Sequence, residues 1–513
     1  MHYLRAVSSL QFAEFPGKDF RMSHQDMESE VINHQALKQA IDLLMPAAAF
    51  RSVKVRAGAT WKARMLATAA FVMGCMSIGP LDERFGRARR IADKMFRSFP
   101  SPGKTYEGFK KVLKSKHAQI KLLLMESWRE RMRAMPAREL VEGFDVLAVD
   151  GSRVELPRTR SHEEHYSPSR KSKKKSGKKN PCNKHSRNKN SRKRNSKKKN
   201  TKRANRNSRR GESESTKKKR TSPQMWLTLL WHVGTGLPWN WKTGPSDSSE
   251  RDHLREMLPD LPKNTLITAD AGFVGYEFWK SIVDANLSFV IRVGGNVKLI
   301  RNLGVARQHD QTVYLWPDEA RRRSHPPLVL RLIVLHGGKQ PVYLVTNLPK
   351  SKLTDRQAAR VYHARWGIEV FFRTYKQTFL RRKLRSHKPE YAELELDWSL
   401  LALWGMLLVG QLELHASGQA AARQSPVQTI RAFQTTITEY RIRPATDDYS
   451  LWLGLRTAVL DEPRTTRDKS SRDYPKKKQR ERTSAPKIIT ATKQQILAAQ
   501  QLKQTKQEFR LAA

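Results

Sequence analysis

The chain has little cysteine and no long apolar run. Its 513 residues include only two cysteines, Cys75 and Cys182, so neither a disulfide framework nor a four-cysteine zinc site is possible. Residues 1–17 lack the apolar core of a signal peptide, and the apolar stretches 65–78 and 400–412 are too short or too interrupted to cross a bilayer. Because so few cysteines fit a reducing compartment, we expect a cytoplasmic protein with no membrane partner.

Acidic residues are also few relative to basic ones. The sequence has 48 Asp and Glu against 98 Lys and Arg, a net charge of +50. Residues 170–220 alone contain 25 Lys and Arg against two acidic residues, a charge of +23, which leaves +27 for the remainder. Such an excess predicts a polyanionic partner, for which nucleic acid is the first candidate. Because the basic run has no apolar periodicity, we expect a disordered insertion over residues 158–222.

Helical periodicity dominates the first part of the chain. After a flexible N-terminus over residues 1–36, we expect a helical domain over residues 37–140. The second of its helices presents five Lys and Arg beside apolar residues, so we interpret this domain as DNA-binding. For any one helix, a solvated basic face is the alternative. The predicted helices, separated by Gly-Pro and Pro-rich breaks, cover 59–76, 81–96 and 105–132.

From residue 141 the pattern changes to alternating strands and helices, which indicates an α/β domain over residues 141–415. We expect Ser248 to cap the first helix of this domain, residues 249–258. We also expect a β-rich insertion over residues 295–350, with no helix between this insertion's start and Thr354. A helical and basic C-terminal region covers residues 416–513. The predicted strands are 145–150, 154–156, 225–233, 239–242, 264–270, 288–293, 312–316, 328–335 and 341–346, and the predicted helices are 249–258, 276–285, 362–379, 394–412 and 493–509.

One predicted helix, residues 362–379, carries four polar side chains at spacings of three, four and seven: Tyr362, Arg365, Glu369 and Lys376. At about 100° per residue these side chains share an arc roughly 60° wide, next to an apolar stripe that would face a core. One carboxylate, two cations and a phenol in this arrangement suit a site for a metal ion and phosphates. The alternative is an ordinary amphipathic helix whose polar flank carries ion pairs.

Two further carboxylates, Asp150 and Asp270, end predicted strands. Ligands of open α/β sheets bind beyond the carboxyl ends of strands, so we expect both side chains and Glu369 at one crevice. Three oxygen ligands that leave open positions are what two Mg²⁺ ions bound to a phosphodiester require, and we expect Mn²⁺ to substitute. The sequence therefore predicts Asp150, Asp270 and Glu369 as catalytic residues and metal ligands. For a single Asp at a strand end, a turn cap or a surface ion pair is the alternative.

Taken together, Asp150-Gly-Ser, Asp270-Ala-Gly-Phe273 and the Tyr362, Arg365, Glu369, Lys376 set resemble the DDE transposases of bacterial insertion sequences, in the insertion-sequence-four family. The resemblance covers roughly residues 50–460. It implies an RNase H-like catalytic domain, with a mixed five-stranded sheet and flanking helices, that carries the β-rich insertion. It also implies Mg²⁺-dependent cut-and-paste transposition through a DNA hairpin, with Tyr362, Arg365 and Lys376 on DNA phosphates and a homodimer on DNA. The location that it implies is the bacterial cytoplasm, at the nucleoid.

Several interpretations stay open. The Lys-rich run is not part of the family core, and its role is open. Family members that form a hairpin hold a flipped base with a tryptophan of the insertion; Trp316 is the only tryptophan within residues 295–350, and a buried strand aromatic is the alternative. The alternative functions are a catalytically inactive, transposase-derived DNA-binding protein and an RNase H-like nuclease. A set with passable zinc spacing falls in or beside the basic run, where histidines are common by chance: His162, His165, Cys182 and His185.

Overall fold

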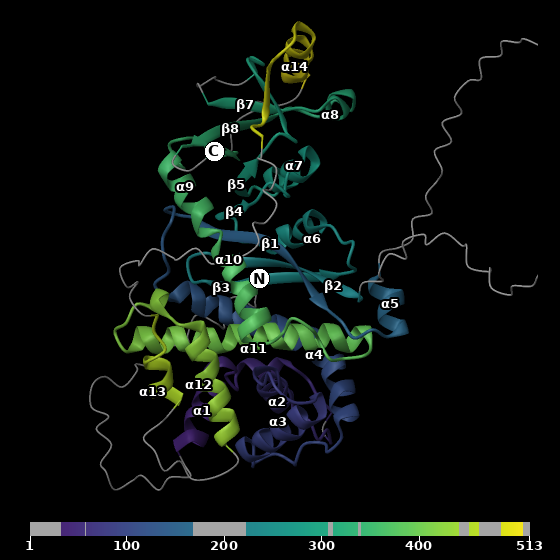
Figure 1. Ribbon diagram of the computed structural model, residues 1–513, viewed down its shortest axis with the longest axis vertical. Helices are drawn as coiled ribbons and strands as arrows, with labels where there is room; N and C mark the ends of the chain where they lie inside the picture. Colours follow the sequence, from purple (N-terminus) through teal and green to yellow (C-terminus); the bar gives the residue numbers. More distant parts are fainter. Residues whose placement is uncertain are drawn as a thin grey trace, which may run out of the picture.

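The computed structural model describes residues 32–56, 58–167, 222–305, 311–336, 340–440, 451–460 and 484–505. Within these residues the chain has a mixed α/β architecture, with one large mixed sheet and a layer of packed helices at one end (Figure 1). The prediction of an α/β fold is therefore confirmed. The predictions for residues 1–31 and 170–220, including Cys182 and His185, lie outside the described residues.

Five strands form the first part of the sheet: β1 Asp145–Glu155, β2 Gln224–His232, β3 Leu237–Gly244, β4 Thr265–Ala269 and β5 Ser288–Val293. They lie in the order β3-β2-β1-β4-β5. β4 pairs in parallel with β1 and with β5, whereas β2 pairs antiparallel with both β1 and β3. Every residue of β4 is buried, as expected for a parallel strand that is covered on both faces. The helices α6 Glu250–Met257 and α7 Tyr276–Asp284 pack against these strands.

The β-rich insertion continues this sheet and does not form a separate one. β9 pairs antiparallel with β5, with Thr346 opposite Val290. The expected five-stranded sheet is wrong in extent, because the hydrogen bonds between β5 and β9 extend it to ten strands in the order β10-β6-β7-β8-β9-β5-β4-β1-β2-β3. The added strands are β6 Lys298–Arg301, β7 Thr312–Leu315, β8 Leu328–Leu335, β9 Val342–Thr346 and, from near the end of the chain, β10 Lys487–Thr490.

The helical layer is built around one long helix, α11 Pro389–Ala416. Helices from both ends of the chain pack against it: α1 Ile32–Leu44, α2 Ala63–Cys75, α4 Tyr106–Ala134, α12 Pro426–Glu439 and α13 Leu451–Arg456 (Figure 1). Gly74 of α2 allows a close approach to α11, because a Cβ there would lie 2.6 Å from the carbonyl oxygen of Trp398. The N-terminal and C-terminal helices therefore share one core.

The length of α11 differs from the expectation. The apolar stretch within it was predicted to be too short for a bilayer, but the helix extends beyond that stretch at both ends to 28 residues. It is long and apolar enough to cross a membrane, and 78% of its most apolar window is buried inside the protein. Its apolar surface thus serves as the contact surface for the surrounding helices.

Most other helix predictions agree with the structure within a few residues, and the differences have local causes. Ser249 rather than Ser248 caps α6, since its side chain accepts a hydrogen bond from Asp252 N. α1 starts at Ile32, so residues 32–36 of the expected flexible N-terminus are helical. The helix α8 corrects the expectation of no helix before Thr354. The remaining elements outside the site are α3 Leu81–Met95, α5 Arg160–Tyr166, α8 Asp318–Arg322, α14 Lys493–Thr505 and the 3₁₀ turns Ala49–Ser52, Leu258–Asp260 and Ala421–Arg423.

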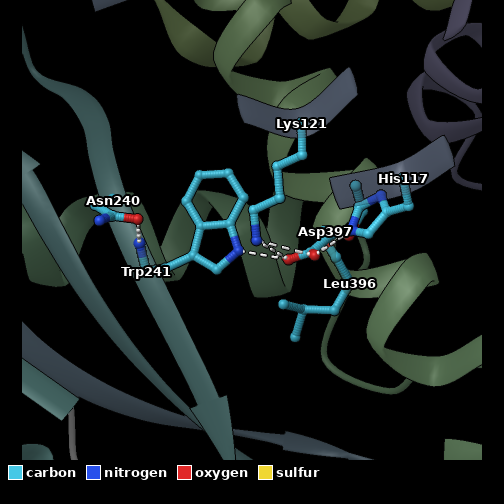
Figure 2. A network of polar contacts seen from close by, with 7 residues as sticks. His117, Lys121, Asn240, Trp241, Leu396 and Asp397 are labelled. Atoms are coloured by element: carbon cyan, nitrogen blue, oxygen red, sulfur yellow. Dashed lines mark hydrogen bonds and ion pairs between the residues drawn. The ribbon is translucent and has the colours of Figure 1, made fainter. Parts of the chain in front are cut away.

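A buried ionic network connects the helical layer to the sheet (Figure 2). Oδ1 of Asp397 on α11 accepts hydrogen bonds from Nε1 of Trp241 on β3 at 2.6 Å and from Nζ of Lys121 on α4 at 2.9 Å. Its Oδ2 lies 2.6 Å from Nε2 of His117, also on α4. Burial alone would raise the pKa of Asp397, but Lys121, His117 and Trp241 hold this pKa well below its usual range. This network joins helix α4 of the predicted helical domain to β3 of the predicted α/β domain. The boundary between these two domains stays a prediction.

Candidate active site

Asp150 and Asp270 lie at the same edge of the parallel part of the sheet. Asp150 was predicted to end its strand, and this is wrong: β1 continues to Glu155 because β2 pairs with it over its whole second half. The parallel pairing of β1 with β4, however, stops at Ala148 and Thr268, and Asp270 follows the last residue of β4. Both carboxylates therefore project just beyond the end of this parallel pair.

The helix that carries Glu369 consists of three segments and is not the single regular helix that was predicted. These are α9 Asp355–Ala364, α10 Gly367–Arg373 and a π-helical turn, Thr374–Thr378. Between α9 and α10 the hydrogen bonds tighten to three-residue spacing, as from Glu369 N to Trp366 O. The four polar side chains are therefore not spaced at a constant 100°, because the helix tightens at Arg365 and widens before Lys376. Mid-helix changes of this kind often mark functional positions.

Gly367 sets the distance between this helix and the sheet. A Cβ at this residue would overlap Cη2 of Trp231 on β2 and would lie 2.8 Å from its Cζ3. The backbone of α10 therefore rests directly on the indole ring, and α10 also contacts β1. This packing brings Glu369 toward Asp150 on β1.

The carboxylates influence one another electrostatically. Burial raises the pKa of Asp150 to about 6, the hydrogen bond from Gly151 N lowers it, Asp270 raises it, Arg365 lowers it and Glu369 raises it. Asp270 and Glu369 therefore both lie close enough to act on the Asp150 carboxylate. As the side chains stand, no group of three or more His, Cys, Asp or Glu among the described residues is close enough to hold one metal ion. Glu369 instead accepts a hydrogen bond from Nη2 of Arg365 at 3.2 Å.

The predicted phosphate-binding residues line the same region. The side chain of Arg365 is largely buried, and its guanidinium lies 5.5 Å from the centre of the Tyr362 ring. Lys376 reaches across to β1, where its Nζ donates a hydrogen bond to Oγ of Ser152 at 2.6 Å. Burial, followed by nearby Arg382, lowers the pKa of Lys376. Two cations thus flank Glu369 and Asp150, an arrangement that can neutralise a bound anion.

One acidic residue of this region was not predicted as a site residue from the sequence. Glu250 is the first residue of α6, where an acid interacts favourably with the helix dipole. In the structure its carboxylate lies against Gly151: a Cβ on that glycine would overlap Oε1 of Glu250 and lie 2.6 Å from its Cδ. Burial, Asp150 and Asp270 raise the pKa of Glu250 to about 7, while Arg153 and Arg251 lower it. We call Asp150, Asp270, Glu369 and Glu250 the acidic cluster.

The acidic cluster fits a divalent cation by its chemistry. All of its donors are carboxylate oxygens, the ligands that Mg²⁺ prefers. Neighbouring members raise the pKa values of Asp150 and Glu250, so a cation between them would relieve a repulsion that now exists. The fit would require Glu369 to turn away from Arg365, and the roles of the individual residues stay predictions.

The candidate base-holding residue Trp316 and the two described histidines of the possible zinc set, His162 and His165, have ordinary structural contacts. Trp316 is buried, and its Nε1 donates to the carbonyl oxygen of His325 at 2.8 Å. It therefore has no free ring face for a base in this conformation. His162 is buried in α5 with its Nδ1 2.9 Å from Pro157 O, and His165 packs edge-on against the Tyr166 ring.

Comparison with known proteins identifies related sequences. The family model described as "Transposase DDE domain" matches residues 142–404, which include every member of the acidic cluster. The transposase InsG for insertion sequence element IS4 of Escherichia coli (strain K12) is 28% identical over 181 residues, 33% of this chain and only 38% of the length of InsG. The piggyBac transposase synaptic complex with hairpin DNA, solved by electron cryo-microscopy, aligns with 85% of this chain and 87% of that chain at 13% identity and a TM-score of 0.35.

Proposed function

The chain belongs to the transposase DDE domain family, and from this premise we propose that it is an active transposase of an insertion sequence. It binds the ends of the element and catalyses Mg²⁺-dependent DNA cleavage and strand transfer. We propose the cut-and-paste route through a hairpin, with a homodimer on DNA at the nucleoid of a bacterial cell. Two observations support the proposal: Asp150 and Asp270 lie at one edge of the sheet, and Asp270 and Glu369 both raise the pKa of Asp150.

The proposed catalytic domain is RNase H-like. Support comes from the first five strands, a mixed unit in which only β2 runs against its neighbours β1 and β3. Asp150 and Asp270 come from its adjacent strands β1 and β4, and Glu369 comes from a helix that packs on β2 and β1. In this proposal the β-rich insertion lengthens the same sheet between Asp270 and Glu369.

In this site, the protein's own groups position DNA and balance charge. Mg²⁺, when bound, acts as a Lewis acid toward the phosphodiester and lowers the pKa of the attacking water. Asp150, Asp270 and Glu369 would hold the metal. Arg365 and Lys376, both within the partly buried wall of the site, would neutralise phosphate charge, and Arg365 can do so with two parallel donors. Tyr362 stacks under the Arg365 guanidinium and would hold it in place while also contacting a phosphate.

The phosphate-binding roles are tested with Arg365→Ala and Lys376→Ala. Both variants should impair hairpin formation and strand transfer more than they impair binding of the element end, since we assign end recognition mainly to residues 37–140. The matched control is Lys280→Ala, which removes one cation from an exposed ion pair with Asp284 on α7. If Arg365→Ala lost end binding altogether yet cleaved normally at saturating protein, this helix would be a recognition element instead.

The activity itself is tested with the full-length protein and DNA that carries the terminal sequences flanking its gene. A gel assay that separates bound, nicked, hairpin and joined DNA should show all four species in Mg²⁺. Binding without any cleavage would favour the inactive, transposase-derived DNA-binding protein. Cleavage of an RNA–DNA hybrid, with terminal DNA left intact, would favour an RNase H-like nuclease.

A further inference from the structure

Glu250 differs from the other acidic residue at the start of its helix. Asp252 is exposed and forms an ion pair with Arg255 at 2.7 Å, which is the ordinary use of an acid in a first helical turn. Glu250 is half-buried and lies against β1. Its side chain therefore lies toward Asp150 and Asp270, whereas that of Asp252 faces solvent.

The strand beside Glu250 is built to admit its carboxylate. Gly151 lies in β1 between Asp150 and Ser152 and pairs regularly with Thr228 of β2. Its backbone has no positive φ, so no turn requires glycine at this position. What requires it is space: a Cβ would overlap Oε1 of Glu250 and would lie 2.8 Å from Cζ2 of Trp226. The glycine next to Asp150 thus leaves the volume that the Glu250 carboxylate occupies.

No cation compensates Glu250 closely. Within the part of the chain that the structure describes, its side chain has neither a hydrogen bond nor a salt bridge. The two arginines that lower its pKa make their closest recorded contacts elsewhere, Arg153 over the Trp226 ring at 4.9 Å and Arg251 as donor to Val274 O at 2.7 Å. A partly buried carboxylate without a partner lowers the stability of the fold. A positive charge bound beside Glu250, Asp150 and Asp270 would offset this cost.

We propose that Glu250 is a fourth metal ligand of the proposed catalytic site, which takes a divalent, oxygen-preferring cation together with Asp150 and Asp270. This inference rests on the proposed function. Carboxylate oxygens suit such a cation. A fourth carboxylate also explains why glycine follows the first catalytic aspartate.

The test uses Tb³⁺, a cation that prefers oxygen ligands and luminesces when a nearby tryptophan is excited. Trp226 lies against Gly151, so Tb³⁺ in the site should be sensitised by its ring, and Trp226→Phe identifies this part of the signal. Titrations with Tb³⁺, followed by displacement with Mg²⁺, are made on the full-length protein. The variants are Glu250→Gln, Asp270→Asn and the control Glu256→Gln, which removes one exposed carboxylate from the same helix.

We expect Glu250→Gln to weaken Tb³⁺ and Mg²⁺ binding by at least about tenfold, Asp270→Asn to abolish the displaceable signal, and Glu256→Gln to leave it unchanged. Wild-type affinity in Glu250→Gln, with the signal lost in Asp270→Asn, would overturn the role of Glu250 and leave the proposed function intact. A signal that survives Asp270→Asn would instead contradict the metal site of the proposed function, and Glu250 with it. If Glu250→Gln fails to fold, Gly151→Ala is the second variant, because its methyl group would displace the Glu250 carboxylate while all four acids are retained. It should weaken Tb³⁺ binding similarly. Undiminished Tb³⁺ affinity in Gly151→Ala would equally overturn the proposal.

Discussion

Two carboxylates of the same chain, buried Asp397 and half-buried Asp150, have opposite electrostatic surroundings. Asp397 accepts hydrogen bonds from Lys121 and Trp241 and contacts His117, and these partners hold its pKa well below the usual range. Asp150 has one backbone donor, and burial and neighbouring carboxylates raise its pKa to about 6. The first carboxylate is compensated within the protein. The second is compensated only in part, by Gly151 N and Arg365.

In the proposed function, this difference separates a structural acid, Asp397, from a functional one, Asp150. A buried charge that is fully paired contributes to holding elements together, and removal of one partner leaves the others uncompensated. A buried charge crowded by like charges weakens the fold and is kept where chemistry requires it. Asp397 joins α4, α11 and β3, whereas Asp150 faces a site where a cation and DNA phosphates would complete the charge balance. The predictions below test this contrast in order of expected size.

The largest effect is expected for Asp397→Ala. Loss of this carboxylate leaves Lys121 and His117 partly buried without a counter-charge, so the free energy of unfolding should fall by about 3–5 kcal/mol. The control is Glu390→Ala, which removes the exposed Lys114–Glu390 ion pair between the same two helices and should cost less than about 1 kcal/mol. Denaturant unfolding of both variants measures the difference. Similar losses in both would show that burial of the network adds nothing.

The opposite sign is expected for Asp150→Asn. The pKa of Asp150 is about 6 in the folded protein against an ordinary value of 3.8, so its charged form is the less favourable one in the folded state. At pH 8 without divalent cations, the neutral amide should therefore stabilise the fold by about 1–3 kcal/mol. The gain should shrink as the pH falls from about 6 toward 4, where the wild-type carboxyl becomes protonated as well.

Thermal unfolding of Asp150→Asn across this pH range checks the sign. Asp284→Asn, which neutralises an exposed carboxylate on α7, is the control and should give no such gain. A destabilised Asp150→Asn at pH 8 would mean that its surroundings compensate Asp150 as fully as they compensate Asp397.

A smaller effect is expected from the metal. Mg²⁺ at about ten times its dissociation constant should stabilise the wild-type protein by about 1.4 kcal/mol. Protons compete for Asp150, whose pKa is raised to about 6, so this stabilisation should be present at pH 7.5 and lost as the pH falls below about 6. Thermal unfolding with and without Mg²⁺ measures it. Equal stabilisation of Asp150→Asn and wild type would place the cation elsewhere.

The sequence predicted those features that depend on local pattern. Apolar periodicity gave α3, α4, β5 and β8 to within a few residues, and the spacing from Tyr362 to Lys376 predicted helical structure that the chain forms in three segments. Two errors in the same region arise from long-range pairing. β1 runs through Gly151–Arg153, which lack an apolar alternation, because β2 hydrogen-bonds alongside them. The sheet continues into the insertion because β9 pairs with β5, and no local sequence pattern predicts which strand will pair with β9.

Glu250 was missed for a related reason. Its position in a first helical turn has a sufficient local explanation, since acids there interact favourably with the helix dipole. Its second role depends on a glycine 99 positions earlier in the chain, as Gly151 leaves the space into which the carboxylate fits. Only the packing of α6 on β1 shows this.

The central claim is that the carboxylates just beyond the parallel pairing of β1 with β4, together with Glu369, hold the metal for DNA cleavage, and Asp270→Asn tests it most directly. Single-turnover cleavage of end DNA in Mg²⁺ is measured for this variant and for the wild-type protein, with the affinity for end DNA determined in parallel. Because metal-assisted charge stabilisation contributes several kcal/mol, the rate should fall by at least about a thousandfold while end binding is unchanged. Cleavage by Asp270→Asn at the wild-type rate would contradict the account.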